Sequence, residues 1–421
     1  MFNNIRNVLN YPKRFNKNQK FNNIQEESNS IENTSNDFSY TKEDLDILRL
    51  IRTENIGTKT FMRLLRMFKT ASEAILHVKD FSLRGGNKKD LCIYSQEDAE
   101  KEMLSIKNFG ANFLTYKSSN YPYMLKNIDI PPIFLTYKGN LNLLDNDKII
   151  SIVGARNASI NTMSFIYNIS KSLSEEGYTI VSGLARGIDA QAHKASYSKS
   201  CGVIPGGINI IYPNENKEVY NNLAIKGLIL SEFPFNQPIT PYMFSSRNRI
   251  IAALSQQIII AEASFSSGTM KTAQYALDYG RDVFVVPSFP LDPRSKGGNK
   301  LIKEGAYLFD EVEDIINHRN HITNNIISPK YRIKSPENKY FTDQFNEDEE
   351  LSILLNNQHK LQISDHQRQT VLEHLSYTPC SYDRLLEELD ISKHSLDIIC
   401  LELELAGKII RVSNDQIVLV N

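Results

Sequence analysis

Residues 148–159 read KIISIVGARNAS, an apolar run rich in isoleucine that ends in a glycine turn and a serine able to cap a helix. Continuous apolar runs of this kind are typical of strands buried on both faces of a parallel sheet. Helical patterns separate further runs of the same type, and the set comprises KIISIV, YTIVSG, GVIPGG, LILSEF, QIIIAEA and DVFVVP. Strands that alternate with helices predict an α/β domain with a Rossmann-like, doubly wound parallel sheet.

The composition of the sequence changes on both sides of this α/β pattern, which predicts that the chain contains further domains and linkers. The expected parts are a disordered tail (1–39), a helical domain (40–115), an extended Rossmann-like domain (116–317), a linker (318–362) and a winged-helix-like domain (363–421). The first 25 residues are basic without any acid, so an organellar transit peptide is the alternative for the start of the tail. Its abundance of asparagine favours disorder.

The helical domain begins with Thr41, which is placed to cap a helix that has acids in its first turn. A glycine turn, ENIGTKT, separates this helix from a second one. The order is that of a helix-hairpin-helix or SAM-like domain, and a small helical bundle is the alternative because the fuller glycine pattern is missing.

The C-terminal stretch has the order of a winged helix, three helices followed by two strands around the turn SND. Its third helix carries the acids Asp397, Glu402 and Glu404 against the bases Lys393 and Lys408. Phosphates gain little from such a surface, so we expect a protein-contact or packing module here rather than a DNA reader.

Bulk properties exclude several classes of protein. The 421 residues contain 48 Lys and Arg against 49 Asp and Glu, so anion binding has to come from local clustering of charge. The four cysteines are scattered without metal-ligand spacing, which fits a reducing compartment and predicts no metal. No apolar run reaches the roughly 20 residues that span a bilayer, so the sequence predicts a soluble, cytoplasmic protein without a membrane partner.

The turns after the predicted strands carry the candidate binding groups. In a doubly wound sheet, ligands lie beyond the carboxyl ends of the strands, where glycine turns and helix N-termini offer N–H groups to anions. Arginine, lysine and hydroxyl side chains accompany these turns, and together they predict a phosphate-binding crevice lined by Gly154, Arg156, Ser182, Gly183, Arg186, Lys217, Arg247, Arg249, Ser267, Gly268 and Thr269.

Catalytic groups are sparse in the predicted crevice. Asp189 and His193 are four residues apart on one helix and could form an acid–base pair, but a structural pair that fixes the turn is favoured because no nucleophile accompanies them. Glu232 and Glu262 are the obvious carboxylates, with a second role as partners of the arginines. Neither GxGxxG nor a P-loop is present, so no cofactor is expected.

The ordered motifs SIVGAR, VSGLARGIDAQAH, GGINIIYPNEN, LILSEFP, FSSRNRIIAALS, IIIAEASFSSGTMKTAQYA, GRDVFVVP and GGNKLIKEGA resemble the DNA-processing protein A family, DprA or Smf. The resemblance spans about residues 120–310. It implies a non-enzymatic protein that binds single-stranded DNA, dimerises and loads a RecA-type recombinase during natural transformation and recombination. It also adds Asn248 to the DNA-binding residues and offers Phe244 or Phe265 to stack a base.

The chain departs from the family pattern at two positions. Ser288 replaces the usual glycine after Val-Pro, and Ala155 replaces the serine before Arg156. Neither change removes charge, so we expect DNA binding to persist. Dimerisation should use apolar faces late in the domain, with Leu277 and Ile302 as candidates.

Two other functions compete with this interpretation. One is a nucleotide-processing enzyme similar to the phosphoribohydrolases, whose PGGxGTxxE pocket matches Gly268 and Thr269 but has Thr272 where the catalytic glutamate belongs. The loss of that carboxylate removes the hydrolytic chemistry and leaves the phosphate cradle. The other is an interaction scaffold for a recombinase, for which DNA is secondary.

Overall fold

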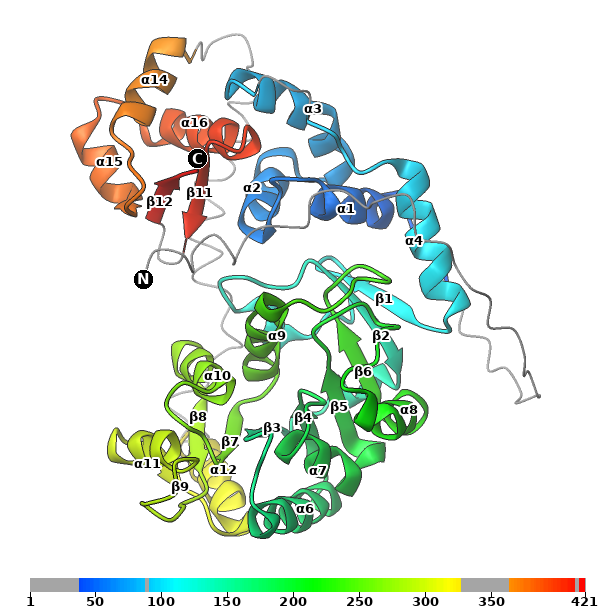
Figure 1. The fold of residues 1–421 in the computed structure, drawn as a ribbon. Coiled ribbons are helices and arrows are strands. Elements are labelled where there is room, and N and C mark those ends of the chain that lie inside the picture. The colour runs from blue at the N-terminus through cyan, green and yellow to red at the C-terminus, as the bar shows by residue number, and fades with distance from the viewer. Residues whose placement is uncertain (1–37, 88–90, 327–362, 413–415, 421) are drawn as a thin grey trace.

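A computed structural model describes residues 38–87, 91–326, 363–412 and 416–420, which form an N-terminal group of helices, a central α/β part and a C-terminal winged helix (Figure 1). The predicted tail, apart from residues 38 and 39, lies outside the described residues, and so does most of the predicted linker. The linker was predicted to begin too early, because residues 318–326 continue helix α12 (Val312–Ile326).

The N-terminal part consists of helices α1 (Lys42–Arg52), α2 (Thr58–Phe68), α3 (Ala71–Arg84) and α4 (Gln96–Asn108). The predicted cap of the first helix is confirmed. The side chain of Thr41 accepts from the Asp44 N–H, and Asp44 in turn accepts from the Thr41 backbone, which completes a capping box. Leu48, Phe61 and Leu64 are fully buried where α1 and α2 meet.

The predicted parallel sheet is confirmed. The six apolar runs form β3 (Ile149–Gly154), β4 (Thr179–Ser182), β5 (Ser200–Val203), β6 (Leu228–Ser231), β7 (Gln257–Ala261) and β8 (Asp282–Val285). They are neighbours in the order β6-β5-β4-β3-β7-β8, and every pair among them is parallel. The strand order therefore reverses between β3 and β7, where a doubly wound sheet opens a crevice.

Three further strands widen the sheet to nine. The antiparallel strands β1 (Asn112–Thr115) and β2 (Phe134–Gly139) extend it beyond β6, and the short β9 (Tyr307–Leu308) pairs with β8. None of the three has the long apolar run of the central strands. Both residues of β9 are exposed, and β2 alternates only weakly, so their sequences carry little strand signal.

Helices cover both faces of the sheet, as Figure 1 shows. One face packs Ile152, Ile180 and Ile259 against α6 (Ile160–Glu175), α7 (Ile188–Ala195) and α12. The other packs Val153, Val181 and Ile260 against α9 (Pro241–Ala253), α10 (Gly268–Asp278) and α11 (Lys296–Lys303). Helix α8 (Lys217–Lys226) lies along the β5 and β6 side, and the short α5 (Tyr123–Lys126) contacts α9.

The C-terminal part has the predicted order of helices and strands. Helices α14 (Asp365–Glu373), α15 (Tyr382–Glu388) and α16 (Lys393–Leu405) precede β11 (Ile409–Val412) and β12 (Gln416–Leu419). A two-residue strand, β10 (Cys380–Ser381), completes a three-stranded sheet in the order β10-β12-β11. This part lies beside α2 and α3 in Figure 1, and α16 contacts both helices.

Candidate nucleic-acid interface

A hollow of about 300 Å³ opens at the carboxyl edge of the sheet, beyond β3, β4 and β5. Its walls come from the turns after these strands, from the segment that leads into α8 and from α9. The lining residues are Arg156, Gly183, Ala185, Arg186, Pro205, Tyr212, Pro213, Glu215 and Phe244. Three of the predicted site residues, Arg156, Gly183 and Arg186, thus come together here.

Aromatic rings form one wall of the hollow. The guanidinium carbon of Arg156 lies 4.8 Å from the centroid of the Phe244 ring, within the range of a cation–π contact. The Tyr212 ring meets Phe244 edge to face, with centroids 5.7 Å apart and planes at 67°. An exposed guanidinium, a half-buried phenyl ring and an exposed phenol therefore lie next to one another.

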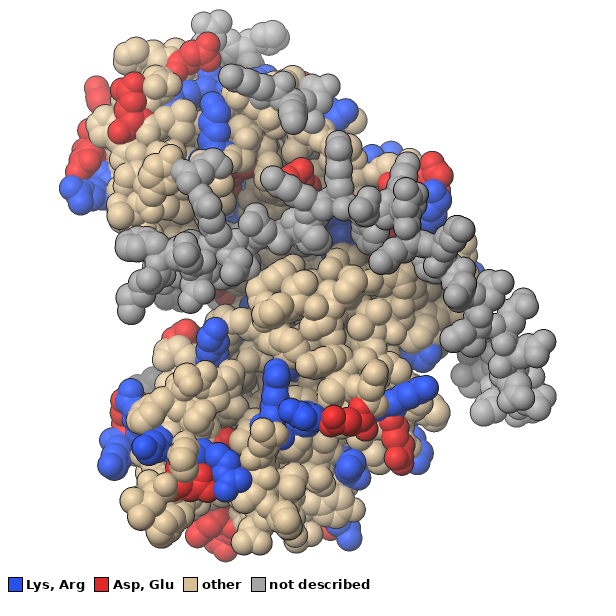
Figure 2. Space-filling model, in the orientation of Figure 1, with Lys and Arg blue, Asp and Glu red and all other residues tan. Residues whose placement is uncertain are grey.

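The charge at the hollow is local. Arg156 and Arg186 are exposed, and Arg186 lies 3.9 Å from the carboxylate of Glu215, a contact between two exposed side chains. Such a pair stabilises a fold very little, so the Arg186 guanidinium can exchange partners at low cost. Lys217, the first residue of α8, is exposed as well. Figure 2 shows Lys and Arg intermixed with Asp and Glu over this part of the molecule, without a continuous basic field.

Arg247 is predicted to contact DNA, but the structure places it inside the fold. It is 4 % exposed, and its Nη1 donates to the carbonyls of Gly183 and Val203, the latter at 2.7 Å. Burial lowers the pKa of Arg247 to about 10, which still leaves it charged at neutral pH, and the nearby Asp189 carboxylate favours that charge. Arg247 therefore binds the ends of two strands from within the fold.

Arg249 is buried too, and its partner is Glu232. Its Nη2 donates to the Glu232 carboxylate, which follows strand β6. The sequence left open whether the arginines of the FSSRNR stretch face DNA or pair with Glu232 or Glu262. For Arg249 the structure shows the pairing with Glu232.

The N-terminus of α10 holds four of the predicted residues in an internal network. Asn248 donates to the Gly268 carbonyl at 3.2 Å, and Thr269 donates to the Gly154 carbonyl at 3.0 Å. Asn248 and Thr269 are buried, whereas Gly268 is exposed and Ser267 caps the helix by accepting from the Met270 N–H. Ser267 is partly exposed, and neither Ser267 nor Gly268 is among the residues that line the hollow.

Two further predicted residues serve the packing of the sheet. The Ser182 hydroxyl is fully buried and donates to the Ile152 carbonyl at 2.6 Å. Gly154 was expected to admit a ligand, but a Cβ there would lie 2.1 Å from the Ala261 carbonyl oxygen and 2.6 Å from the Ile188 side chain. Its small size is required where β7 and α7 approach the end of β3.

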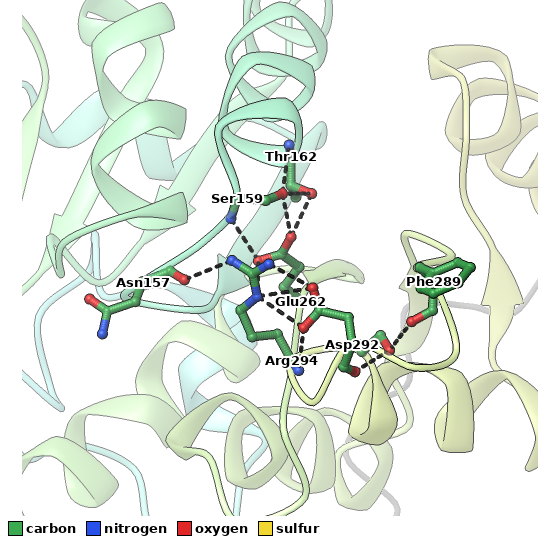
Figure 3. A network of polar contacts seen from close by, with 8 residues as sticks. Asn157, Ser159, Thr162, Glu262, Phe289, Asp292 and Arg294 are labelled. Atoms are coloured by element: carbon green, nitrogen blue, oxygen red, sulfur yellow. Dashed lines mark hydrogen bonds and ion pairs between the residues drawn. The ribbon is translucent and has the colours of Figure 1, made fainter.

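The N-terminus of α6 is occupied by the protein's own carboxylate. Glu262 follows β7 with a φ of 51°, in the left-handed region that a glutamate rarely adopts, and it is 5 % exposed. Figure 3 shows its carboxylate facing Ser159 and Thr162 of α6. It accepts from the Ser159 N–H at 2.9 Å, the Ser159 hydroxyl at 2.6 Å and the Thr162 hydroxyl at 2.8 Å. The N–H group and hydroxyls at this helix N-terminus are therefore already bound by Glu262.

Arg294 closes this network from the other side (Figure 3). Its Nε lies 3.9 Å from Glu262, its side chain donates to both Asp292 oxygens, and its Nη1 donates to the Asn157 carbonyl at 3.4 Å. The hydrogen bonds that Asp292 accepts from the side chain and the backbone N–H of Arg294 lower the pKa of Asp292 to about 2. Glu262 and Arg294 hold the 155–159 turn, and this turn carries Arg156 into the hollow.

Asp189 and His193 hold turns, as the favoured interpretation expected, but each binds its own partner. Asp189 accepts from the N–H groups of Gly183 and Ala185, whereas His193 Nδ1 bonds the Ser200 hydroxyl at 2.6 Å. Burial lowers the pKa of His193 to about 3, so its ring is neutral near pH 7. The two side chains do not act as an acid–base pair in this arrangement.

The groups that line the hollow suit an anion joined to a flat ring. Among the residues that the structure describes, no three His, Cys, Asp or Glu side chains form a group that could hold a metal ion. Thr272, at the position of the phosphoribohydrolase glutamate, donates to the Gly268 carbonyl at 3.2 Å. The hollow offers two guanidinium groups and two aromatic rings, with the Glu215 carboxylate 3.9 Å from Arg186.

Part of this site was not predicted from the sequence. Tyr212, Pro205 and Glu215 line the hollow, but a Tyr-Pro step and a lone proline are typical of turns and gave no binding signal. Phe244 was considered for stacking, with core packing as the more ordinary role, and it contributes to the wall. Phe265 is 59 % exposed, with Lys300 Nζ 6.0 Å from its ring centroid.

Three family models match the chain. The model described as DNA recombination-mediator protein A matches residues 112–320. A DprA-like N-terminal HHH domain matches residues 41–104, and a DprA winged helix domain matches residues 358–414.

Individual proteins are similar as well. DNA processing protein DprA of Bacillus subtilis is 39 % identical over 209 residues, which cover 49 % of this chain and 70 % of that protein. DNA processing protein DprA of Streptococcus pneumoniae is 40 % identical over 200 residues, or 47 % of this chain and 70 % of that protein. The X-ray structure of DprA from Streptococcus pneumoniae matches with a TM-score of 0.55 at 29 % identity, covering 66 % of this chain and 98 % of that one.

Proposed function

Because the chain belongs to the DNA recombination-mediator protein A (DprA) family of DNA-processing proteins, we propose that the hollow at the carboxyl edge of its sheet binds single-stranded DNA. The observation that carries this proposal is the contact between the exposed Arg156 guanidinium and the Phe244 ring, with Tyr212 beside them. Guanidinium groups bind phosphates without regard to sequence, and aromatic rings stack on any unpaired base.

The size of the hollow supports a single strand over a duplex. A space of about 300 Å³ can receive one base with its sugar, but a base can enter only when it is not paired and stacked in a helix. In the proposed mode a base lies against the wall of Phe244 and Tyr212. The adjacent phosphates lie at Arg156 and Arg186, and Arg186 gives up its weak contact with Glu215.

We further propose that the protein acts without catalysis. Its buried groups with acid–base character serve other purposes, since His193 is neutral and Glu262 accepts three hydrogen bonds. Incubation with nucleoside monophosphates should therefore release no free base, as measured by chromatography. Release of base would favour the phosphoribohydrolase-like alternative.

The wider role is proposed from the family. The matched description, a recombination mediator, supports a RecA-type recombinase as the partner that the bound strand is passed to, in natural transformation and recombination in the cytoplasm. A homodimer is proposed through the late helices of the α/β part, where Leu277 is 49 % exposed and Ile302 is half-buried. No helix in the described ranges is long and apolar enough to cross a membrane.

Fluorescence anisotropy with a labelled oligo-dT strand and a matched duplex tests the DNA proposal. We expect the single strand to bind more tightly, with an affinity that falls steeply as salt rises. The double variant Arg156→Ala/Arg186→Ala should reduce the slope of log affinity against log salt by about 1.4, because each lost single-strand phosphate contact contributes about 0.7.

The matched control removes the same charge elsewhere. Lys226→Ala/Lys171→Ala changes two exposed lysines, one in the last turn of α8 and one on α6, away from the residues that line the hollow. It should leave both affinity and salt slope nearly unchanged. Equal affinity for single strand and duplex, or equal losses in the two double variants, would contradict binding in the hollow.

A further inference from the structure

The third helix of the winged helix, α16, is enclosed on two sides. In DNA-binding helix-turn-helix and winged folds this is the helix that enters the major groove. Here one face, with Leu396, Ile399 and Leu403, packs into the core of its own domain. The other face carries Ile398, Leu401 and Leu405, and these residues share one hydrophobic core with the N-terminal helices α1, α2 and α3.

An ion-pair network crosses between the two parts of the chain at Glu404. This α16 residue is 5 % exposed, and its carboxylate accepts from Arg63 of α2 at 2.9 Å and from the Thr60 hydroxyl at 3.3 Å. Arg411 of β11 donates to the same carboxylate at 3.0 Å. Glu404 therefore joins the strand beside α16 to a helix more than 300 residues earlier in the chain.

Glu402, a second acid on α16, is buried within the winged helix itself. It is fully inaccessible, and Arg368 of α14 binds it at 2.7 Å. From the sequence, Glu402 and Glu404 were expected to be surface acids to which phosphates gain little by approaching. Both are buried and form ion pairs, Glu402 with Arg368 and Glu404 with Arg63. The reason to expect a contact module is therefore this buried pairing, and not repulsion of phosphate at the surface.

The backbones of the two parts also fit closely. The Ser82 hydroxyl donates to the Leu405 carbonyl at 3.1 Å, which satisfies one of the acceptors that every helix leaves unpaired at its C-terminus. Lys59 Nζ donates to the Val412 carbonyl at 3.3 Å. At the end of α3, a Cβ added to Gly85 would lie 2.0 Å from the Glu402 carbonyl oxygen and 2.8 Å from the Ala406 Cβ.

We propose that the C-terminal winged helix is a protein-docking module, closed through α16 on the N-terminal helices of the same chain, and that it takes no part in DNA binding. The face that α16 would present to a groove is apolar, and its buried acids are matched to Arg63 and Arg368. The partner that this surface fits is the α2–α3 pair. The proposal is independent of DNA binding in the hollow, because none of the residues that line the hollow belongs to the N-terminal helices or to the winged helix.

A glycine substitution tests the docking with little effect on either part alone. Gly85 has a φ of −66° and a ψ of −5°, a conformation that any residue adopts, so Gly85→Ser adds only a clash with α16. Gly57→Ser is the matched control, because nothing lies within 4 Å of a Cβ there and its backbone is extended. Both variants are made in the full chain.

We measure hydrogen exchange of α16 and α3, the radius of gyration by small-angle X-ray scattering, and anisotropy with oligo-dT and duplex. Gly85→Ser should speed exchange in α16 by about tenfold or more and expand the molecule. Its affinity for both DNA forms should stay within about twofold of the parent, a change of less than about 0.5 kcal/mol. Gly57→Ser should change none of these quantities.

A second pair of variants tests the same contact without changing Gly85, so that local unfolding at Gly85 is not mistaken for loss of docking. Arg63→Glu opposes Glu404 with a like charge across the contact, whereas Arg66→Glu makes the same change on the exposed face of the same helix. The first should open the contact and the second should not. Unchanged exchange in both Gly85→Ser and Arg63→Glu would overturn the docking. An opened variant that gains about tenfold in duplex affinity would identify α16 as a masked DNA reader instead.

Discussion

Replacing Arg249 distinguishes an internal arginine from a DNA contact. The residue lies in the FSSRNR stretch, whose arginines the family resemblance assigns to DNA, but its side chain is 7 % exposed and binds Glu232 at 17 % exposure. Tyr121 and Tyr279 are close enough for their pKa values to respond to its charge. We choose Arg249→Met, which keeps the apolar stem and removes the charge.

The size of the effect follows from the burial of the pair. Removing one partner of a buried ion pair costs about 3–5 kcal/mol, because the remaining charge is left without compensation. Glu232 retains some exposure, so we expect the lower end, about 3 kcal/mol of unfolding free energy. The double variant Arg249→Met/Glu232→Gln leaves no unpaired charge, and it should recover about 1.5–3 kcal/mol of the summed single losses.

Urea unfolding followed by far-ultraviolet circular dichroism is the suitable assay, since the chain has no tryptophan to report on the transition. Oligo-dT affinity of folded Arg249→Met should stay within about twofold of the parent, because no DNA contact is lost. A variant with normal unfolding free energy and a tenfold loss of affinity would refute this reasoning and return Arg249 to the DNA site.

Three shorter predictions concern other residues of the crevice. Burial lowers the pKa of His193 to about 3, so below pH 6.5 the unfolded chain binds a proton that the folded chain does not. Stability should therefore fall as pH drops from 6.5 towards 3, by up to about 1.4 kcal/mol per pH unit, and His193→Gln should remove this slope in urea unfolding. Glu262→Gln places an amide N–H₂ against donors from Ser159 and Thr162, and it should cost about 1–3 kcal/mol of unfolding free energy. Phe244→Leu should weaken oligo-dT binding by about 1–3 kcal/mol with little loss of stability, as measured by anisotropy.

Each of these predictions has a result that would contradict it. An unchanged pH slope in His193→Gln would mean that the histidine ring takes up protons in the folded state. Full stability in Glu262→Gln would mean that the carboxylate does not hold the start of α6. Unaltered oligo-dT affinity in Phe244→Leu would remove the aromatic wall from the binding site.

The central sheet was predictable because its strands are unusually uniform. Ile149, Ile150 and Ile152 in one strand, and Ile258, Ile259 and Ile260 in another, are buried, and such runs alternating with helical patterns are typical of a parallel sheet covered on both faces. Strands β1, β2 and β9 were missed because none of them has a run buried along its whole length: half of β1 and of β2 is only partly buried or exposed, and both residues of β9 are exposed. The resemblance to the DprA family is confirmed by the family models.

The direction of the crevice side chains was not predictable from the sequence. An arginine after a strand can point outward to a ligand or inward to unpaired carbonyls, and the sequence is the same in both cases. The Arg156 side chain is exposed, whereas the Arg247 side chain points inward and donates to the Val203 carbonyl. The docking of α16 on the N-terminal helices could not be predicted from the sequence either. Glu404 and Arg63 are 341 positions apart, and no local sequence pattern relates them.

The FSSRNR stretch contains both a residue that lines the hollow and residues that form hydrogen bonds inside the fold. Phe244 faces the hollow, and the next turn of α9 fixes that position from within. Arg247 binds the carbonyls of Gly183 and Val203 at the ends of β4 and β5, Asn248 binds the start of α10, and Arg249 binds the acid after β6. Three strand ends and a helix therefore set the place of one aromatic ring. A loss of DNA affinity on replacing Arg247 would then arise from movement of Phe244 and Gly183, and it should appear together with a loss of stability, whereas Arg156→Ala should lose affinity alone.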